Sequence, residues 1–262
     1  TVTDRQGRLV RDLTREDFEV YEDGDRQPVT QFSDIRTPVS VLVLLDASDS
    51  MRGQPIVDAR GAMDRFMAGL LEPGDEGAVA VFSHLTRILT PWTSPPAGLA
   101  GRLDDERPFG GTAIYDALVA VAPMFSRRHR PRGALVVVSD GADTASDRGL
   151  AETREMLRRL DAFVYAIAID ASTERRASTR VNPAALQEIT APSGGYTEVV
   201  HGYDEIGPAT SRIAEELSAQ YTLAFSTSKP QDGSWRSLRV RVKGQDYLAR
   251  ARRGYYAGKI GR

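Results

Sequence analysis

The chain has 262 residues, 41% of them hydrophobic, so it can bury a full core as one large domain or as one domain with a small companion. Its formal net charge of −2 gives no sustained positive field, so nucleic acid is not expected as a partner. The lack of cysteine excludes disulfides, zinc ribbons and thiol nucleophiles, and three scattered histidines do not suit a histidine-rich zinc site.

Membrane insertion and lysine-based chemistry are also not expected. No apolar run reaches the roughly 18 residues that span a bilayer, and the opening TVTDRQGRLV lacks the apolar segment of a signal peptide. The only lysines are Lys229, Lys243 and Lys259, so the chain before Lys229 supplies none for phosphate binding or a Schiff base.

The N-terminal segment has the pattern of a β hairpin. In DFEVYEDGDRQPVTQFS, residues 17–33, two alternating runs flank Asp23 and Gly24, and an Asp-Gly pair in that position is a strong hairpin signal. An isolated hairpin is marginally stable in water, so this segment needs a partner elsewhere in the chain.

From about residue 38 to residue 218, short apolar runs alternate with longer segments of helical period, as in βα units with a parallel sheet. The expected strands are 39–46, 77–83, 133–140, 162–169 and 196–200, with 86–92 as a proline-containing edge strand. The expected helices are 55–71, 113–125, 148–160, 183–190 and 203–220. Met63 and Met67, at helical spacing, are interpreted as core residues.

The C-terminal runs YTLAFSTS, WRSLRVRVKG and DYLARARRGYY are again strand-like, with alternating arginines on an expected solvated face. We therefore predict that residues 1–37 and 219–262 form a small β-sandwich-like domain, and that an α/β domain of residues 38–218 is inserted between them. The predicted α/β domain is doubly wound and Rossmann-like, with a mostly parallel six-stranded sheet and helices on both faces.

Polar side chains gather where the first strand of this sheet ends. Asp46, Ser48 and Ser50 follow the run VSVLVLL at i, i+2, i+4 spacing, at the edge where open α/β sheets bind ligands. A tight loop there can turn one carboxylate and two hydroxyls inward. Such hard oxygen ligands suit Mg²⁺, Mn²⁺ or Ca²⁺ rather than zinc.

Two other loops place oxygen ligands at the same predicted edge. Asp140 stands at a strand end in VVVSDGADTAS, where Gly141 permits a close turn, and Thr112 follows a glycine pair before a helix in PFGGTAIYDAL. Each signal alone is weak, because a threonine before a helix is usually a cap and an Asp-Gly pair is usually a turn. In the alternative interpretation, all five side chains only satisfy turn amides and helix N-termini, without a metal.

Together, D-x-S-x-S at 46–50, the threonine of GGT at 112 and the aspartate of SDG at 140 resemble the metal-ion-dependent adhesion site of von Willebrand factor A domains. The resemblance covers roughly residues 38–218 and implies that Ser48 and Ser50 bind the cation directly, whereas Thr112, Asp46 and Asp140 bind it directly or through water. It also implies Mg²⁺ as the cation, with Mn²⁺ or Ca²⁺ as alternatives, and a protein partner that presents an Asp or Glu.

The two ends of the chain extend the resemblance. LTREDFEVYEDGDRQPVTQFS and DGSWRSLRVRVKGQDYLARARRGYYA are similar to the ends of a bacterial group related to von Willebrand factor A and abundant in acidobacteria. Members of that group are typically exported, so the resemblance implies an extracytoplasmic or secreted location.

Other interpretations of the oxygen cluster fit less well. An EF-hand loop counted from Asp46 needs glycine and glutamate where the chain has Met51 and Val57. An aspartyl phosphohydrolase needs a second carboxylate at position 48, which is serine, and a cation over the phosphate; an arginine can supply that cation, so this class stays open. A serine hydrolase lacks its G-x-S-x-G elbow, although a serine paired with His84 is conceivable, and no phosphate loop of G-x-x-x-x-G-K-[ST] type occurs.

Two functions of different classes therefore remain. In the first, neutral hydroxyl ligands leave a divalent cation under-neutralised, so its open position favours a partner's carboxylate, and the protein binds without catalysing a reaction. In the second, the protein is a structural module whose small β domain makes the contacts without a metal. Loss of partner binding on Asp46→Ala would separate the first function from the second.

Overall fold

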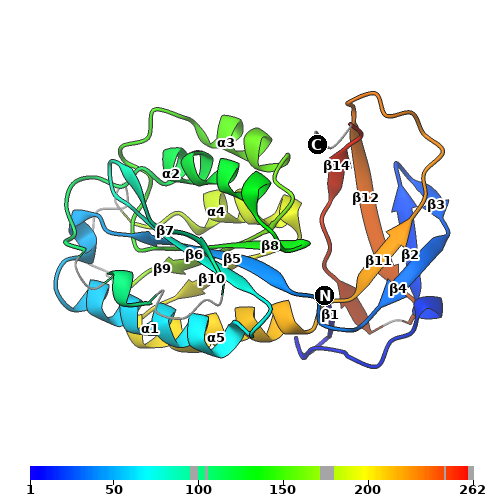
Figure 1. Ribbon diagram of the computed structural model, residues 1–262, viewed down its shortest axis with the longest axis horizontal. Coiled ribbons are helices and arrows are strands. Elements are labelled where there is room, and N and C mark those ends of the chain that lie inside the picture. The colour runs from blue at the N-terminus through cyan, green and yellow to red at the C-terminus, as the bar shows by residue number, and fades with distance from the viewer. Residues whose placement is uncertain (95–99, 104–105, 172–179, 245, 259–262) are drawn as a thin grey trace.

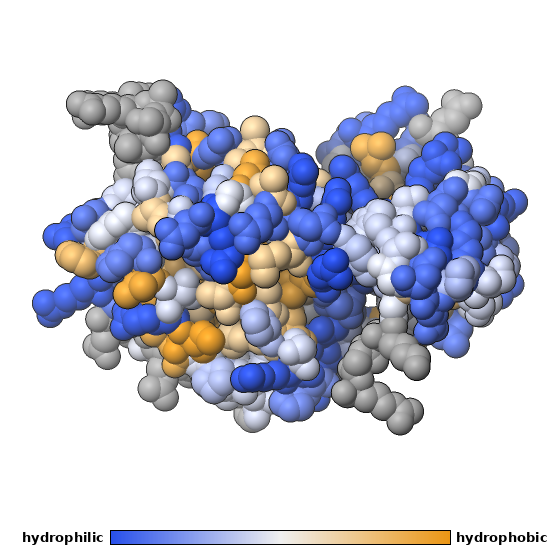
Figure 2. Space-filling model, turned by 90° about the horizontal axis from the view of Figure 1, so that it is seen from above, coloured by the Kyte–Doolittle hydropathy of each residue, from blue (hydrophilic) through white to orange (hydrophobic). Residues whose placement is uncertain are grey.

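The computed structural model describes residues 1–94, 100–103, 106–171, 180–244 and 246–258, and these form two lobes (Figure 1). An α/β lobe is built from the middle of the chain, and a β lobe is built from strands of both chain ends. The space-filling view shows the two lobes meeting along a narrow waist (Figure 2). Within the described residues, no helix is both long enough and apolar enough to cross a membrane.

The α/β lobe contains one six-stranded sheet in the order β10-β9-β8-β5-β6-β7. Its strands are β5 (Val39–Asp46), β6 (Glu76–Phe82), β7 (Thr86–Thr93), β8 (Arg132–Ser139), β9 (Phe163–Ile169) and β10 (Thr197–Val200). All neighbours pair in parallel except β6 and β7, which are antiparallel. The predicted doubly wound, mostly parallel sheet is therefore confirmed, and β7 lies at its edge as expected.

Helices cover both faces of this sheet (Figure 1). The helix α1 (Gln54–Leu70) and the helix α5 (Ile206–Ser218) pack on one face, and α2 (Ile114–Val121), α3 (Leu150–Leu157) and α4 (Pro183–Thr190) pack on the other. Short 3₁₀ helices are η1 (Arg15–Asp17), η2 (Asp49–Met51), η3 (Ala100–Leu103), η4 (Ala122–Arg127), η5 (Ala191–Ser193) and η6 (Tyr203–Glu205). The predicted helix 113–125 was partly wrong, because its α-helical part ends at Val121, and Pro123 lies in the 3₁₀ helix that follows.

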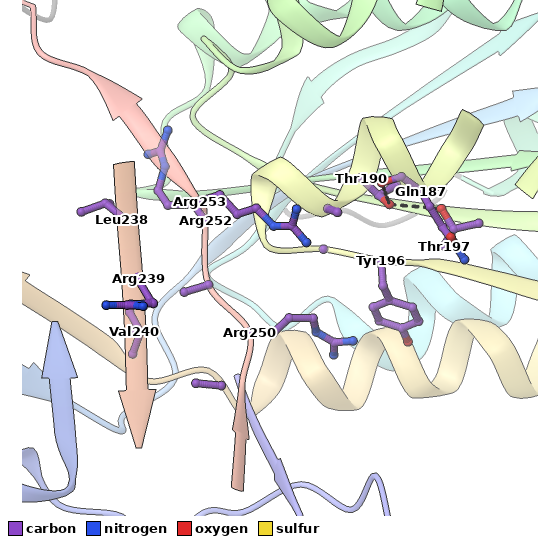
Figure 3. Close-up of a pocket in the computed structure, with 14 residues that line it drawn as sticks. Gln187, Thr190, Tyr196, Thr197, Leu238, Arg239, Val240, Arg250, Arg252 and Arg253 are labelled. Carbon is purple, nitrogen blue, oxygen red and sulfur yellow. Dashed lines mark hydrogen bonds between the residues drawn. The ribbon is translucent and has the colours of Figure 1, made fainter. Parts of the chain in front are cut away.

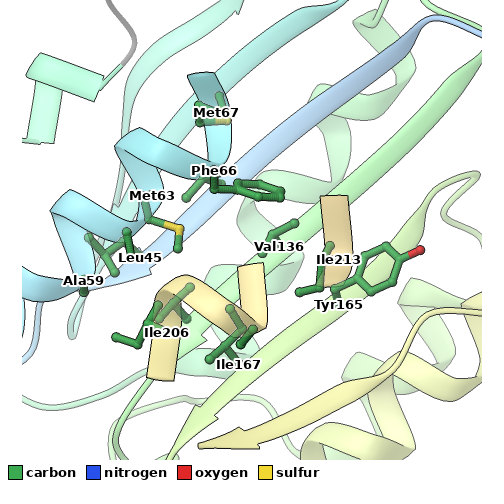
Figure 4. Close-up of a cluster of buried hydrophobic side chains, with 14 of the residues drawn as sticks. Leu45, Ala59, Met63, Phe66, Met67, Val136, Tyr165, Ile167, Ile206 and Ile213 are labelled. Atoms are coloured by element: carbon green, nitrogen blue, oxygen red, sulfur yellow. The ribbon is translucent and has the colours of Figure 1, made fainter. Parts of the chain in front are cut away.

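The core alternates along β5, as expected for a strand that is covered on both faces. Val43 and Leu45 face the layer of α1 and α5, whereas Leu42 and Leu44 face the opposite layer. On the first face, Met63, Phe66 and Met67 of α1 pack with Ile206 and Ile213 of α5 (Figure 4). The two methionines are thus core residues, as the spacing predicted.

The β lobe joins the two ends of the chain in three small sheets. Their strands are β1 (Val2–Asp4), β2 (Phe18–Glu22), β3 (Asp25–Gln27), β4 (Val29–Ser33), β11 (Thr222–Phe225), β12 (Trp235–Val242), β13 (Tyr247–Ala249) and β14 (Gly254–Tyr256). The sheets have the orders β14-β12-β2-β3, β11-β4 and β1-β13, so each contains strands from both ends. The division into one domain of residues 38–218 and a second domain of residues 1–37 with 219–262 stays a prediction.

Two details of this lobe concern the predicted strands. The hairpin at Asp23 and Gly24 is confirmed, and both residues have positive φ, 49° and 91°, as a tight two-residue turn requires. The run DYLARARRGYY is not one strand, because β13 and β14 belong to different sheets. The residues between them instead bind the rest of the molecule through backbone hydrogen bonds from Arg250 to Thr1 and from Arg253 to Pro192.

Candidate metal centre

The predicted oxygen ligands lie at the topological switch point of the sheet. The strand β5 pairs with β6 on one side and with β8 on the other, and the chain crosses over from β7 to β8. Ligands of open α/β sheets bind in the crevice outside the carboxyl ends of such strands. Asp46 ends β5 and Asp140 follows β8, so both border this crevice, at the end of the sheet away from the β lobe (Figure 1).

Asp46 is fully buried and held by two neighbours. Its Oδ1 accepts the backbone N–H of Ser48 at 2.8 Å, and its Oδ2 accepts the hydroxyl of Ser139 at 2.5 Å. The first contact closes a tight turn at the end of β5, as aspartate side chains commonly do. Both oxygens are therefore fixed, one toward the loop of residues 46–50 and one toward β8.

The two serines of the D-x-S-x-S motif connect Asp46 to Asp140 through a row of oxygens. Ser48 Oγ and Ser50 Oγ lie 2.9 Å apart, and the Ser50 hydroxyl donates to Asp140 Oδ1 at 2.6 Å. The hydroxyl of Tyr203 donates to the other oxygen, Asp140 Oδ2, at 2.9 Å. Residues from two other loops thus converge on the Asp140 carboxylate.

Thr112 reaches the same place from the loop before α2. Its carbonyl accepts the N–H groups of Thr144 and Ala145 at 2.8 and 3.1 Å, and its own N–H donates to Thr144 Oγ1. A Cβ atom on Gly141 would lie 3.1 Å from Thr112 Oγ1, so the threonine hydroxyl rests against the backbone that follows Asp140. The structure therefore brings all five predicted residues together.

The surroundings of the Asp46 carboxyl disfavour its charged form. Burial raises its pKa to about 6, and the nearby charge of Asp140 acts in the same direction. The hydrogen bonds from Ser139 and Ser48 lower the pKa and only partly compensate. A positive ion beside these carboxylates would favour their charged forms.

The donor set fits a hard divalent cation. Neighbouring ligands of an octahedral Mg²⁺ ion, at bond lengths near 2.1 Å, lie about 2.9 Å apart. The spacings of 2.9 Å between Ser48 and Ser50 and of 2.6 Å between Ser50 and Asp140 are close to this value. Among the described residues, no three His, Asp or Glu side chains gather at one site, so a cation here would depend on hydroxyl oxygens. Oxygen-only sites favour Mg²⁺, Mn²⁺ or Ca²⁺.

Two residues at this site, Ser139 and Tyr203, were not predicted from the sequence. Ser139 directly precedes Asp140 on β8, so strand alternation could have placed its side chain on the opposite face, toward Asp46. Tyr203 lies 63 residues beyond Asp140 in η6, and no local pattern links the two.

Comparison with known proteins agrees with the fold of the α/β lobe. Residues 41–142 match the family described as von Willebrand factor type A domain. No curated protein matches the chain. Solved structures with the same fold, each under 25% identical, include a von Willebrand factor type A protein from Catenulispora acidiphila, with 13% identity, TM-score 0.61 and coverage of 77% of this chain and 50% of that one.

Two other solved structures are also similar. Proximal thread matrix protein 1 from the mussel byssus, with a zinc-occupied MIDAS motif, has 16% identity and TM-score 0.61 over 74% of this chain and 49% of that one. The vWF domain of the type V pili tip protein Mfa5 from Porphyromonas gingivalis has 12% identity and TM-score 0.54 over 71% and 97%. The chain thus spans about half the length of the first and second of these three proteins. Residues 41–142, which form part of the α/β lobe, thus match the von Willebrand factor type A domain family, and the lobe has the fold of these solved structures.

A separate concavity lies between the two lobes, away from the carboxyl ends of the strands. It has a volume of about 410 Å³ and is bordered by α4, the start of β10, β12 and the segment between β13 and β14 (Figure 3). Of its arginines, Arg250 is bonded to Glu216 and stacks on Tyr196, and Arg252 is bonded to Asp161. These arginines therefore have intramolecular partners that join the lobes.

Proposed function

We propose that this protein is a divalent-cation-dependent protein-binding module that acts without catalysing a reaction. The cation, Mg²⁺ in the first place with Mn²⁺ or Ca²⁺ as alternatives, is held by the side chains of Asp46, Ser48, Ser50, Thr112 and Asp140. It supplies an electrophilic position that a carboxylate of the partner, from Asp or Glu, completes.

The observation that carries this proposal is the row of oxygens from Ser48 through Ser50 to Asp140. A structural serine usually caps a helix or closes a turn by bonding to backbone. Here the two serine hydroxyls bond to each other and to a carboxylate from another strand, at spacings that ligands of one ion would have. The mussel byssus structure with a zinc-occupied motif shows that this fold can hold a divalent cation at such a site.

The charges explain why a partner carboxylate is favoured. Ser48, Ser50 and Thr112 contribute neutral oxygens, and the buried Asp46 is partly engaged by Ser139 and the Ser48 amide. With Asp46 and Asp140 acting through bound water, a divalent ion held directly by these hydroxyls would keep positive charge at its exposed side. An acidic side chain of the partner neutralises it with a charge-assisted bond, which strengthens when water is excluded.

The two alternatives rest on less specific features. A phosphohydrolase would need a carboxylate at position 48 and a cation over the phosphate, but position 48 is a serine that already belongs to the row of oxygens. In a metal-free structural module, the β lobe would make the contacts with a partner. The hydrogen bonds of Ser50 and Tyr203 to Asp140 would then have no part in binding. The matched mussel byssus and pilus tip proteins support an extracytoplasmic location, which we include in the proposal.

Calorimetric titration of Mg²⁺, Mn²⁺ and Ca²⁺ into chelator-treated protein tests the proposal. We expect saturable binding in the parent protein and its loss in Ser48→Ala, because the substitution removes a ligand without changing charge. Ser40→Ala is the matched control, since Ser40 is also buried but lies at the opposite end of β5 and donates to Glu76.

Two outcomes of this titration would contradict the proposal. If no cation binds at up to about 10 mM, well above the weakest affinities of extracellular calcium modules, the metal mechanism is wrong. If cations bind equally well to the parent and Ser48→Ala, they bind elsewhere, and the structural alternative with its contacts in the β lobe gains support.

A further inference from the structure

Two large apolar side chains are exposed beside the candidate metal site. Leu85, in the turn after β6, is 67% exposed, and Phe109, in the loop before Thr112, is 63% exposed. Single exposed apolar residues are ordinary on protein surfaces, but adjacent ones next to a binding site mark contact surfaces.

These residues belong to loops that are joined to the metal site by backbone hydrogen bonds. The N–H of Phe109 donates to the carbonyl of Ala47 at 2.9 Å, and the N–H of Asp49 donates to the carbonyl of Gly110 at 2.9 Å. The N–H of Ser83 donates to the carbonyl of Leu85, which closes the turn after β6. The loop of Phe109 is therefore anchored to the loop that carries Ser48, and the turn of Leu85 is joined to the loop of Thr112, because the N–H of Ala113 donates to the carbonyl of Ser83 at 2.8 Å.

The ring of His84, the residue before Leu85 in the chain, packs against Phe109. It lies edge-on to Phe109, with ring centroids 5.5 Å apart, and it occupies the space over Gly110, where a Cβ atom would lie 2.4 Å from His84 Nδ1. Gly110 has a φ of 82°, which favours glycine in any case. The surface of His84, Leu85 and Phe109, here called the apolar rim, is thus ordered before any partner arrives.

We propose that the apolar rim determines which acidic residue the metal site accepts: an Asp or Glu of a partner protein that stands next to a bulky apolar side chain. This inference rests on the proposed function, since the metal positions the carboxylate. The adjacent apolar side chain then packs on Phe109 and Leu85, where burial removes apolar surface of both molecules from water.

The chemistry of the rim selects this occupant over others. A surface of two exposed apolar side chains beside one imidazole offers few hydrogen-bonding groups to a polar or sugar ligand, and it favours a partner side chain of leucine or phenylalanine type. Because the rim is held in place by the three loops, little ordering is needed on binding, which favours affinity.

The test uses the whole chain and an array of blocked pentapeptides with a central aspartate, flanked by serine, lysine, leucine or phenylalanine. In Mg²⁺ we expect peptides with an apolar neighbour to bind about 10-fold more tightly than peptides with serine, and chelation to abolish binding of all of them. In Phe109→Ser and Leu85→Ser this ratio is expected to fall toward one, whereas Mg²⁺ binding by calorimetry and affinity for the serine peptide stay unchanged.

Leu248→Ser is the matched control, because Leu248 is 66% exposed but lies on β13 in the β lobe, and it is expected to keep the full ratio. Metal-dependent binding without an apolar preference, or with a preference for lysine, would overturn this inference and leave the proposed function standing. Absence of any chelator-sensitive peptide binding would count against both. Concentration-dependent self-association that Phe109→Ser removes would assign the rim to a second copy of the chain instead.

Discussion

Buried carboxylates at the two ends of the central sheet have different kinds of partners. At the amino ends of the strands, Asp75 is bonded to Arg36 at 2.6 Å and Glu76 lies 2.9 Å from His129 Nδ1, and near the β lobe Glu216 is bonded to Arg250. At the carboxyl ends, Asp46 receives its bonds from a hydroxyl and an amide.

The pKa directions follow the same division. Burial alone would raise the pKa of Asp75, but the hydrogen bonds from Arg36 and from the amides of Glu72 and Val39 bring it below its usual value. Burial raises the pKa of Asp46 to about 6. The first end is neutralised by cationic side chains of the protein, whereas Asp46 at the second end is held by neutral donors and would be neutralised by the proposed cation.

The largest expected effect on stability comes from the structural end. Arg250→Ala leaves Glu216 buried beside the Tyr165 hydroxyl without its arginine, and we expect a loss of about 2–3 kcal/mol of unfolding free energy. Chemical denaturation measures this. Arg239→Ala, which removes only an exposed arginine stacked on Tyr21, should cost less than about 1 kcal/mol. Equal costs would mean that Glu216 does not depend on Arg250.

At the carboxyl ends of the strands, substitution of Asp140 should lower the affinity for the cation more than it lowers the stability of the fold. Asp140→Asn keeps an oxygen that can accept from Ser50 or Tyr203 but removes one negative charge, so we expect about 100-fold weaker Mg²⁺ binding. Calorimetry measures the affinity, and a thermal scan in chelator serves as the control for folding. A strongly destabilised variant with unchanged affinity would reverse the roles assigned to the two ends.

The pH dependence of stability should have opposite signs at the two ends. Asp46 has a folded pKa raised to about 6 from 3.8, so in metal-free protein its contribution falls as pH rises between these values. Asp46→Asn should therefore stabilise metal-free protein by roughly 1–3 kcal/mol at pH 8 and by less at pH 5.

Asp75 has a lowered folded pKa, so its contribution is present above its unfolded pKa and is lost as pH falls through the folded value. Asp75→Asn should therefore destabilise at pH 7 and have little effect at strongly acidic pH. Denaturant titrations of both variants across pH measure the two slopes. Slopes of the same sign would contradict the contrast between the two ends.

The smallest expected effect concerns the contact between Gly110 and His84 of the apolar rim. Gly110→Ala places a Cβ atom against the His84 ring at a positive φ, so we expect a loss of about 1–2 kcal/mol and a weaker apolar preference in the peptide array. Gly149→Ala is the control, because nothing lies near its Cβ position and its φ is ordinary, −90°. A similar cost for both would show that His84 does not rest on Gly110.

Much of the α/β lobe could be predicted from local sequence. Strands covered on both faces are continuous apolar runs, which is why the predicted 39–46 matches β5 without a shift. The end of α2 at Val121 was missed, because the apolar period continues into the 3₁₀ helix after it. In the C-terminal run, one alternating pattern served two strands in different sheets, and local periodicity does not specify partners.

By itself, the sequence determined the fold class and the hairpin at Asp23 and Gly24, because both follow from local patterns, and it predicted the five oxygen-bearing residues because their motifs resemble a known site. The tertiary structure alone decided that Tyr203 bonds to Asp140, that His84 packs against Phe109, and that strands from the two chain ends pair with each other. The residues in these contacts are separated along the chain by intervals that follow no helix or strand periodicity. They are set by how the strands order in the sheet and how the loops pack at its edge.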